Sequence, residues 1–301
     1  MSRFVEIQAF IQIVESGSIT AAAERLDLAK SAMSRRLSEL EARLGVQLFY
    51  RTTRKLTLTD SGRGFYERSV RILSDLDEAE QAVSQAHQEI SGPLKVAAPL
   101  TFGIRHLGPA INDFKRAHPL IQFDIDFNDR QIDVVQEGFD LAIRIARLQD
   151  SSLIARRIAN MSVVTCASPA YLQQHGTPQT LDALSEHACL TYSYLDNPNL
   201  WHYHDHQKNE IDVKVKSAMQ ANNGDYLLAA AIDGLGIVRQ PRFIVYEAIR
   251  AGELTPILTD YTIPTVNAYA LYPPTRHLSQ RVRAFVEFLV ERFADKPYWE
   301  R

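Results

Sequence analysis

The chain of 301 residues has little cysteine and no long hydrophobic run. Its two cysteines, Cys166 and Cys189, cannot build a disulfide framework, and such sparse use is typical of a reducing compartment. No uninterrupted apolar stretch of about 18 residues occurs, so no membrane span is predicted. Polar residues also break the opening segment MSRFVEIQAFIQIVESGS, where a signal peptide needs an apolar centre. We therefore expect a cytoplasmic protein that does not interact with membranes.

The sequence also lacks the short motifs of common enzyme classes. It contains no nucleophile elbow, zinc-protease motif, phosphate-binding loop or dinucleotide fingerprint. The glycines of DGLG, residues 233–236, lie at the end of a predicted helix, where glycine is a usual C-cap. We therefore predict that the protein is not an enzyme and that it has no catalytic residue, no metal site and no cofactor.

Two weaker patterns allow a second interpretation. His202, His204 and His206 alternate along WHYHDH, so a strand would place all three on one face, as in a metal site. Solvent-facing histidines on an edge strand are the more common explanation. Cys166 and Cys189 could form a redox pair, but each lies in a strand-like run, where a buried and inert thiol is more common.

Net charge is low, at −3, but the basic residues are unevenly distributed. Residues 25–58 contain eight Lys or Arg and only three Asp or Glu, a local excess of five positive charges. A basic patch within an acidic chain indicates one local anionic partner.

The same region predicts three helices followed by a hairpin. Apolar spacing indicates helices over residues 4–16 and 20–26, and a turn at Asp27 leads into a third helix that ends at Gly45. Two short strands follow, in VQLFYR and KLTLT, and the hairpin between them has a basic tip.

The third helix, within AKSAMSRRLSELEARLG, has two different faces. Met33, Leu37, Leu40 and Leu44 form one narrow apolar stripe that would seat the helix on its domain. Short hydroxyls and an arginine lie on the opposite side, with Arg36 at the flank. Short side chains let a helix enter the major groove, where Arg bonds guanine or phosphate. The basic hairpin tip could reach phosphates or a narrow minor groove. The predicted DNA-binding residues are Lys30, Ser31, Ser34, Arg35, Arg36, Ser38, Arg51, Thr53 and Arg54.

A long helix is predicted from a capping segment at residues 59–61 to about Ile90. Two series of mostly apolar residues recur every seven positions, offset by four, which is the pattern of a coiled coil. The alternative is a long helix packed on its own domain. We predict dimerisation through Phe65, Ile72, Leu76, Ala79 and Val83. Beyond SGP, residues 91–93, strands and helices alternate, which indicates α/β layers; one predicted short helix is QIDVVQEG, residues 131–138.

These segments together resemble the LysR-type transcriptional regulators. The match is dense in ESGSITAAAERL and SAMSRRLSELEARLGVQLFYRTTRKLTLTDSG, and it returns in ANNGDYLLAAAIDGLG. The resemblance implies an α+β and α/β fold: a winged helix-turn-helix, a linker helix that dimerises, and an effector domain that is similar to periplasmic solute receptors and has two α/β subdomains. The corresponding ranges are 1–58, 59–90 and 91–301, with one subdomain at 91–161 and 267–301 and the other at 162–266.

The resemblance also implies partners and a ligand site. The partners are double-stranded DNA, a small-molecule effector, further copies of the chain in a homodimer or homotetramer, and RNA polymerase. The effector would bind between the subdomains, at Leu100, Thr101, Phe102, Asn128, Arg144, Asn223 and Gly224. Two of these segments open helices, whose free N–H groups and positive dipole ends favour an anion. Arg144 and Arg147 could add charge, or they could form ordinary ion pairs with Asp140 and Asp150.

The chain departs from the family pattern at Ala29 and Lys30, where Ser and Gln are usual. Loss of a capping Ser would cost about 1 kcal/mol unless Asp27 or Ser31 replaces it. Lys prefers guanine or phosphate where Gln reads adenine, so the operator preference is expected to differ there. The rival interpretation is a small-molecule receptor or enzyme whose amino-terminal domain serves only in assembly. The exposed Ser/Arg face and basic hairpin argue against it.

Overall fold

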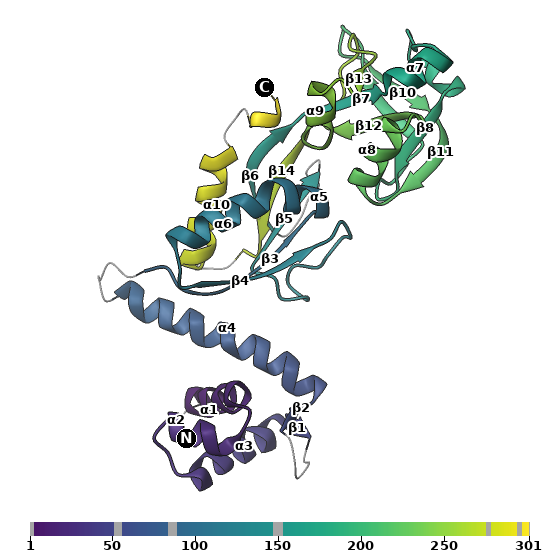
Figure 1. Ribbon diagram of the computed structural model, residues 1–301. Helices are drawn as coiled ribbons and strands as arrows, with labels where there is room; N and C mark the ends of the chain where they lie inside the picture. Colours follow the sequence, from purple (N-terminus) through teal and green to yellow (C-terminus); the bar gives the residue numbers. More distant parts are fainter. Residues whose placement is uncertain are drawn as a thin grey trace. The chain divides into compact units, whose positions relative to one another are not determined.

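The computed structural model divides the chain into two compact units, Met1–Pro93 and Leu94–Arg301, each of which is described by itself (Figure 1). The described residues are 3–50, 56–83, 89–146, 153–274, 278–293 and 297–300. No helix in these ranges combines the length and the apolar character that crossing a bilayer requires.

The first unit has three short helices, a two-stranded antiparallel hairpin and one long helix. Its elements are α1 (Arg3–Ser16), α2 (Ile19–Arg25), α3 (Lys30–Leu44), β1 (Phe49–Tyr50), β2 (Thr57–Leu58) and α4 (Asp60–Val83). The predicted apolar stripe of α3 is confirmed: Met33, Leu37 and Leu40 are buried, and Leu44 packs against the same core. Phe10 of α1 and Leu48 before β1 complete the centre of this core.

Local chemistry determines where the helices begin and end. The Ser18 hydroxyl accepts a hydrogen bond from Ala21 N–H at 3.1 Å and so caps α2. Asp27 has φ of 52°, a left-handed conformation that Asp tolerates better than most residues, and it turns the chain toward α3. Gly45 ends α3 with φ of 71°. The N-cap of α3 is Ala29, and its side chain makes no capping hydrogen bond.

The start of α4 is tied to the hairpin and to the core of its own unit. The Thr59 hydroxyl accepts from Gly62 N–H at 2.9 Å and donates to the Gln47 carbonyl at 2.8 Å. Phe65 packs on this core, with its ring centroid 5.4 Å from that of Phe10. For Phe65 the structure therefore supports the alternative, packing within its own domain, over a position on a free dimer seam.

Farther along α4, the residues predicted to lie on the dimer seam differ in their exposure. Ile72 is 49% exposed, whereas Leu76 is half-buried. Ala79 and Val83 lie in α4, but their side chains are outside the described residues. The predicted extension of the helix to Ile90 is wrong, because Glu89 and Ile90 have no helical conformation.

The second unit contains two five-stranded sheets, each with its own helices, and therefore has two α/β subdomains (Figure 1). The first sheet has the order β4-β3-β5-β14-β6: Ile121–Phe127, Gly92–Ala98, Leu141–Ala146, Val266–Tyr272 and Ile154–Met161. The second has the order β11-β8-β12-β7-β13: Lys216–Ala221, Ala188–Tyr192, Ile237–Pro241, Val163–Ala167 and Thr255–Pro256. A separate antiparallel pair is formed by β9 (Leu200–His204) and β10 (Glu210–Lys214).

Helices complete the hydrophobic cores of both subdomains. The remaining elements are α5 (Leu100–Phe102), a π-helical turn η1 (Gly103–Leu107), α6 (Gly108–Ala117), α7 (Pro169–His175), η2 (Asp182–Glu186), α8 (Gly224–Ile232), α9 (Arg242–Arg250), α10 (Gln280–Phe293) and η3 (Tyr298–Glu300). Phe114 of α6 packs on Phe285 of α10, with ring centroids 5.0 Å apart. The two helices thereby pack against each other beside the first sheet.

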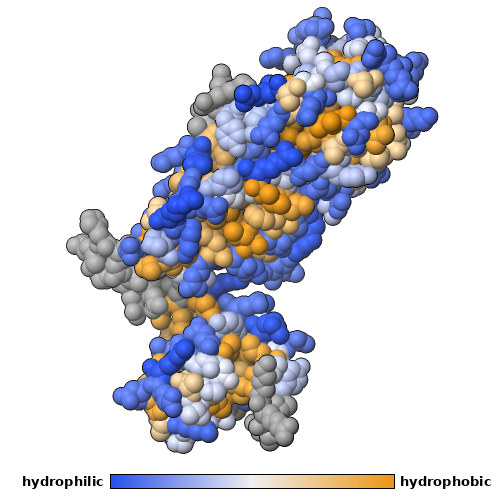
Figure 2. Space-filling model, in the orientation of Figure 1, coloured by the Kyte–Doolittle hydropathy of each residue, from blue (hydrophilic) through white to orange (hydrophobic). Residues whose placement is uncertain are grey.

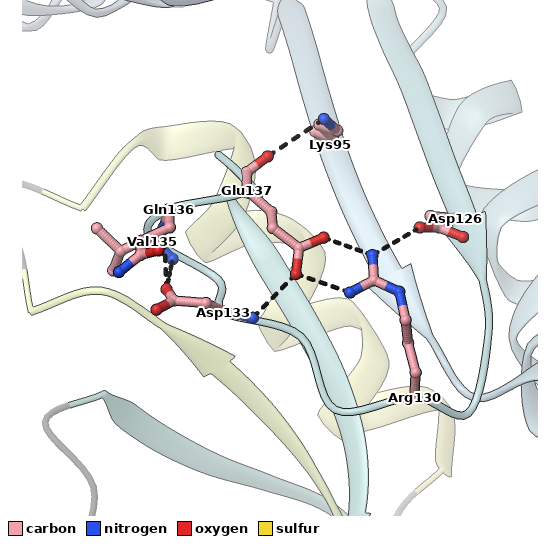
Figure 3. A network of polar contacts seen from close by, with 7 residues as sticks. All are labelled: Lys95, Asp126, Arg130, Asp133, Val135, Gln136 and Glu137. Atoms are coloured by element: carbon pink, nitrogen blue, oxygen red, sulfur yellow. Dashed lines mark hydrogen bonds and ion pairs between the residues drawn. The ribbon is translucent and has the colours of Figure 1, made fainter.

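The predicted short helix in QIDVVQEG is wrong, since these residues form turns (Figure 3). The Asp133 carboxylate accepts from the N–H groups of Val135 and Gln136 at 3.0 and 2.9 Å, which closes a single turn. Gly138 then adopts φ of 68° and stops it. Glu137 pairs with Arg130, whose Nη1 lies 2.8 Å from Glu137 Oε1, and so holds the turn to the segment that leaves β4.

Candidate nucleic-acid interface and effector site

The outward face of α3 is the candidate nucleic-acid interface. Lys30, Ser31, Arg35 and Ser38 are exposed, whereas Ser34 and Arg36 are half-buried. The Arg35 side chain is 66% exposed, and its Nε lies 3.7 Å from Glu39 Oε1. An exposed pair of this kind contributes at most about 1 kcal/mol, so the guanidinium can exchange it for a base or phosphate.

Two buried carboxylates fix the direction of α3. Glu41 accepts hydrogen bonds from the backbone N–H groups of Leu48 and Phe49, at 2.7 and 3.4 Å, and so joins the end of α3 to β1. Glu6 of α1 holds Arg43 through contacts of 2.7 and 3.0 Å. Arg43, counted within the basic patch of the sequence, therefore already has an ion-pair partner in its own domain.

The hairpin tip lies outside the described residues, and with it Arg51, Thr53 and Arg54. The strands on either side are described: Phe49 pairs with Leu58, and Tyr50 pairs with Thr57. This antiparallel register confirms that the two predicted short strands pair with each other.

Thr101, a predicted effector residue, links the two subdomains by a hydrogen bond. It is buried, and its hydroxyl donates to Asp225 of α8 at 2.8 Å. Arg105 adds an ion pair to the same carboxylate at 2.5 Å and donates to the Ile244 carbonyl at 3.1 Å. The α5–η1 segment of the first subdomain is thus bound to helices of the second.

Phe102 belongs to the core rather than to a ligand-facing surface, which corrects the prediction for its side chain. It is fully buried, and its ring lies 5.4 Å from Phe243, 5.6 Å from Phe293 and 5.9 Å from Trp299, centroid to centroid. These rings come from α9, α10 and η3, so this aromatic cluster lies where both subdomains and the carboxyl-terminal segment meet.

The two helix N-termini already have internal partners. Leu100 N–H donates to Asp129 Oδ1 at 2.9 Å, and the Asn223 side chain caps α8 by accepting from Tyr226 N–H at 2.9 Å. Burial raises the pKa of Asp129, although the bonds from Leu100 N–H and the Tyr192 hydroxyl and the charge of Arg144 oppose this shift. The helix dipoles alone therefore give little reason to expect an anionic effector.

Polar atoms without partners lie elsewhere in the same region. Both side-chain polar atoms of Asn128 and Nη2 of Arg144 are buried without a hydrogen-bond partner. Burial lowers the pKa of Arg144, and the charge of Arg130 adds to this shift. The carboxylate of Asp140, one suggested ion-pair partner of Arg144, accepts a hydrogen bond from Lys95 N–H at 2.8 Å. Arg147 and Asp150 are outside the described residues.

Gln240, at the end of β12, was not predicted. It is only 2% exposed, and its Nε2 has no hydrogen-bond partner. It lies beside Gly224, where a Cβ would meet Ile244 Cδ1 at 2.6 Å and Gln240 Oε1 at 3.4 Å. The close approach explains the glycine at the start of α8. A polar residue at the end of a predicted buried strand, GIVRQ, is the signal that could have identified Gln240.

His106 joins the subdomains near the aromatic cluster. Its Nε2–H donates to the Phe243 carbonyl at 3.1 Å, and its Nδ1 accepts from the Tyr298 hydroxyl. The segment η3 is held further by Ser162, whose N–H and hydroxyl donate to the Glu300 carboxylate at 2.8 and 2.6 Å.

Acidification is expected to destabilise the second unit through His106. Burial lowers the pKa of His106 to about 4, and the charges of Arg105, Glu247 and Asp225 act more weakly. The unfolded chain takes up this proton near pH 6.5, so stability falls by about 3 kcal/mol between pH 6.5 and 4. Urea unfolding at pH 7 and at pH 4.5 measures this loss. His106→Gln should show a smaller difference between the two pH values, and an equal difference would contradict the assignment.

The remaining candidates do not form a site. His202 and His204 lie in β9, and His202 Nδ1 is 2.5 Å from Asp212 Oδ1, but His206 lies in the following turn, so the three do not share one strand face. Within the described ranges no group of three or more His, Cys, Asp or Glu could hold a metal ion. Cys166 and Cys189 are buried, and burial raises the pKa of both thiols to about 12, which leaves them unreactive at neutral pH.

Three short helices with a small hairpin, together with a unit of two α/β subdomains, have the organisation of a helix-turn-helix regulator that carries a ligand-binding domain. Residues 4–63 match the family described as "Bacterial regulatory helix-turn-helix protein, lysR family". Residues 87–294 match the "LysR substrate binding domain". The chain belongs to the LysR family of transcriptional regulators.

Similar proteins have the same organisation. The HTH-type transcriptional regulator CrgA of Neisseria meningitidis is 34% identical over 291 residues, covering 96% of this chain and 97% of CrgA. PtxR of Pseudomonas aeruginosa is 35% identical over 294 residues, which cover 97% of this chain and 93% of PtxR. The solved structure of CrgA matches with a TM-score of 0.61 over 97% of this chain and 99% of CrgA. The solved structure of the Vibrio cholerae virulence activator AphB, which is 27% identical, also has a TM-score of 0.61. The match covers 96% of this chain and 99% of AphB.

Proposed function

We propose that the chain binds operator DNA in the cytoplasm by inserting α3 into the major groove, and that a small anionic effector controls this binding. The exposed face of Lys30, Ser31, Arg35 and Ser38, opposite a buried apolar stripe, is the observation that carries the proposal. RNA polymerase is the further partner through which such binding would change transcription.

A gel-shift assay with the DNA upstream of the chain's own gene tests the DNA-binding part. We expect retention of this fragment over a scrambled fragment of equal length, and affinity should fall steeply as salt rises, because phosphate contacts release counterions. No DNA affinity, together with turnover of a ligand, would favour the rival receptor or enzyme.

Assembly is proposed to occur through α4, giving a homodimer that pairs into a homotetramer. Support comes from Ile72, which is 49% exposed on a helix with a seven-residue apolar repeat. Figure 2 shows apolar residues reaching the surface in patches on both units. In a dimer, two copies of α3 would enter successive major grooves about 34 Å apart.

Ile72→Lys should weaken self-association, because it places a charge in an apolar seam. Sedimentation velocity at several concentrations measures the change, with Arg68→Lys on the same helix as the control. An unchanged mass would place the dimer contact elsewhere.

The effector is proposed to bind between the subdomains near Thr101, Asn128 and Arg144. Its anionic character is supported by the buried Nη2 of Arg144, which lacks a hydrogen-bond partner. A thermal-shift screen of small organic acids tests this part, since a ligand that binds the folded state raises the melting temperature.

A further inference from the structure

We infer that the effector is a 2-hydroxycarboxylate: a small acid with a hydroxyl group on the carbon beside its carboxylate. Asn128 would recognise the hydroxyl and Arg144 the carboxylate. The inference rests on the proposed effector site and specifies the chemistry that this site takes.

Asn128 requires a ligand that can both donate and accept a hydrogen bond. Its Nδ2 and Oδ1 are both buried without a hydrogen-bond partner, and an amide has donors on one atom and an acceptor on the other. A carboxylate accepts from Nδ2 but offers no proton to Oδ1. The second group must therefore carry a hydrogen.

Arg144 lies near the same end of the first sheet as Asn128. Asn128 follows β4, and its N–H donates to the carbonyl of Ala98, the last residue of β3, at 3.0 Å. Arg144 lies on β5, which runs parallel to β3 with Ala97 paired to Ala142. Asn128 and Arg144 thus lie on either side of β3, level with its carboxyl end, and the carboxyl ends of strands are where α/β sheets bind ligands. A guanidinium there can hold one carboxylate oxygen while Asn128 Nδ2 holds the other.

The hydrogen-bond partners of the neighbouring groups favour a neutral hydroxyl over an ammonium group. Asp129, the carboxylate that would attract an ammonium, is already engaged by Leu100 N–H and the Tyr192 hydroxyl. Arg144 would repel a positive charge. An ammonium also has three donors, whereas Asn128 offers one acceptor oxygen. A 2-amino acid should therefore bind more weakly than its 2-hydroxy counterpart.

Matched acids provide the test on the full-length protein. The probes are propanoate, lactate and alanine, and succinate, malate and aspartate, with both enantiomers of the chiral acids. Calorimetry or thermal shift should show that one 2-hydroxy acid binds about tenfold or more tightly than its unsubstituted and 2-amino partners, which is the range for one hydrogen bond to a buried group. Asn128→Ala should abolish this preference, Arg144→Met should abolish carboxylate binding, and the exposed Asn112→Ala on α6 should change neither.

The outcomes separate this inference from the proposed function. Equal binding within each set, with carboxylate binding intact, overturns the hydroxyl inference and leaves the anionic effector. Failure of every acid to bind, with operator binding intact, overturns both the inference and the anionic effector but leaves DNA binding. The preference in the unsubstituted protein does not depend on the folding of any variant.

Discussion

Gly62→Ala is expected to destabilise the amino-terminal unit by about 3 kcal/mol or more, at the upper end of overpacking effects. A Cβ at this position would lie 2.0 Å from the Leu48 carbonyl oxygen and 3.0 Å from Leu58 Cδ2. The oxygen belongs to the backbone, so the first turn of α4 would have to move away from Leu48, which precedes β1. Chemical denaturation measures the loss, and operator affinity should fall with it.

Gly64→Ala is the matched control on the same helix. A Cβ there meets nothing within 4 Å, so only helix propensity changes, and we expect a gain of about 1 kcal/mol. Opposite signs for two identical substitutions, two residues apart, separate the packing effect from the propensity effect. Two similar stabilisations would show that α4 does not approach Leu48 this closely.

Arg35→Ala is expected to weaken operator binding by about 1–3 kcal/mol, roughly 5- to 150-fold, the range for one bidentate base contact. The side chain is 66% exposed, and its ion pair with Glu39, at 3.7 Å, is exposed as well, so folding stability should change little. Fluorescence anisotropy with operator DNA measures the affinity.

Arg68 is an exposed arginine on α4, away from the proposed DNA interface on α3. Arg68→Ala therefore removes the same charge without removing a proposed DNA contact. It should leave operator affinity nearly unchanged. An equal loss in both variants would indicate a general electrostatic effect, and no loss for Arg35→Ala would refute the assignment of the outward face. Discrimination between operator and scrambled DNA further separates a base contact from a phosphate contact, since only the former carries sequence information.

The sequence alone determined the family and those helices and strands that bury one face. The spacing of Met33, Leu37 and Leu40 identified the buried side of α3, and therefore the side that remains for DNA, because a helix repeats its faces every 3.6 residues. Alternating strands and helices indicated α/β layers for the same reason: each element must bury one face against another layer.

Only the tertiary structure decided which side chains meet across long stretches of the chain. Glu6 with Arg43, Thr101 with Asp225, and Asp129 at the start of α5 are such contacts. Periodicity shows that a face is buried but does not name its partner, so Phe65 and Phe102, apolar in any interpretation, were assigned to a dimer seam and a ligand site. Their places in cores depend on distant rings, which no local pattern encodes.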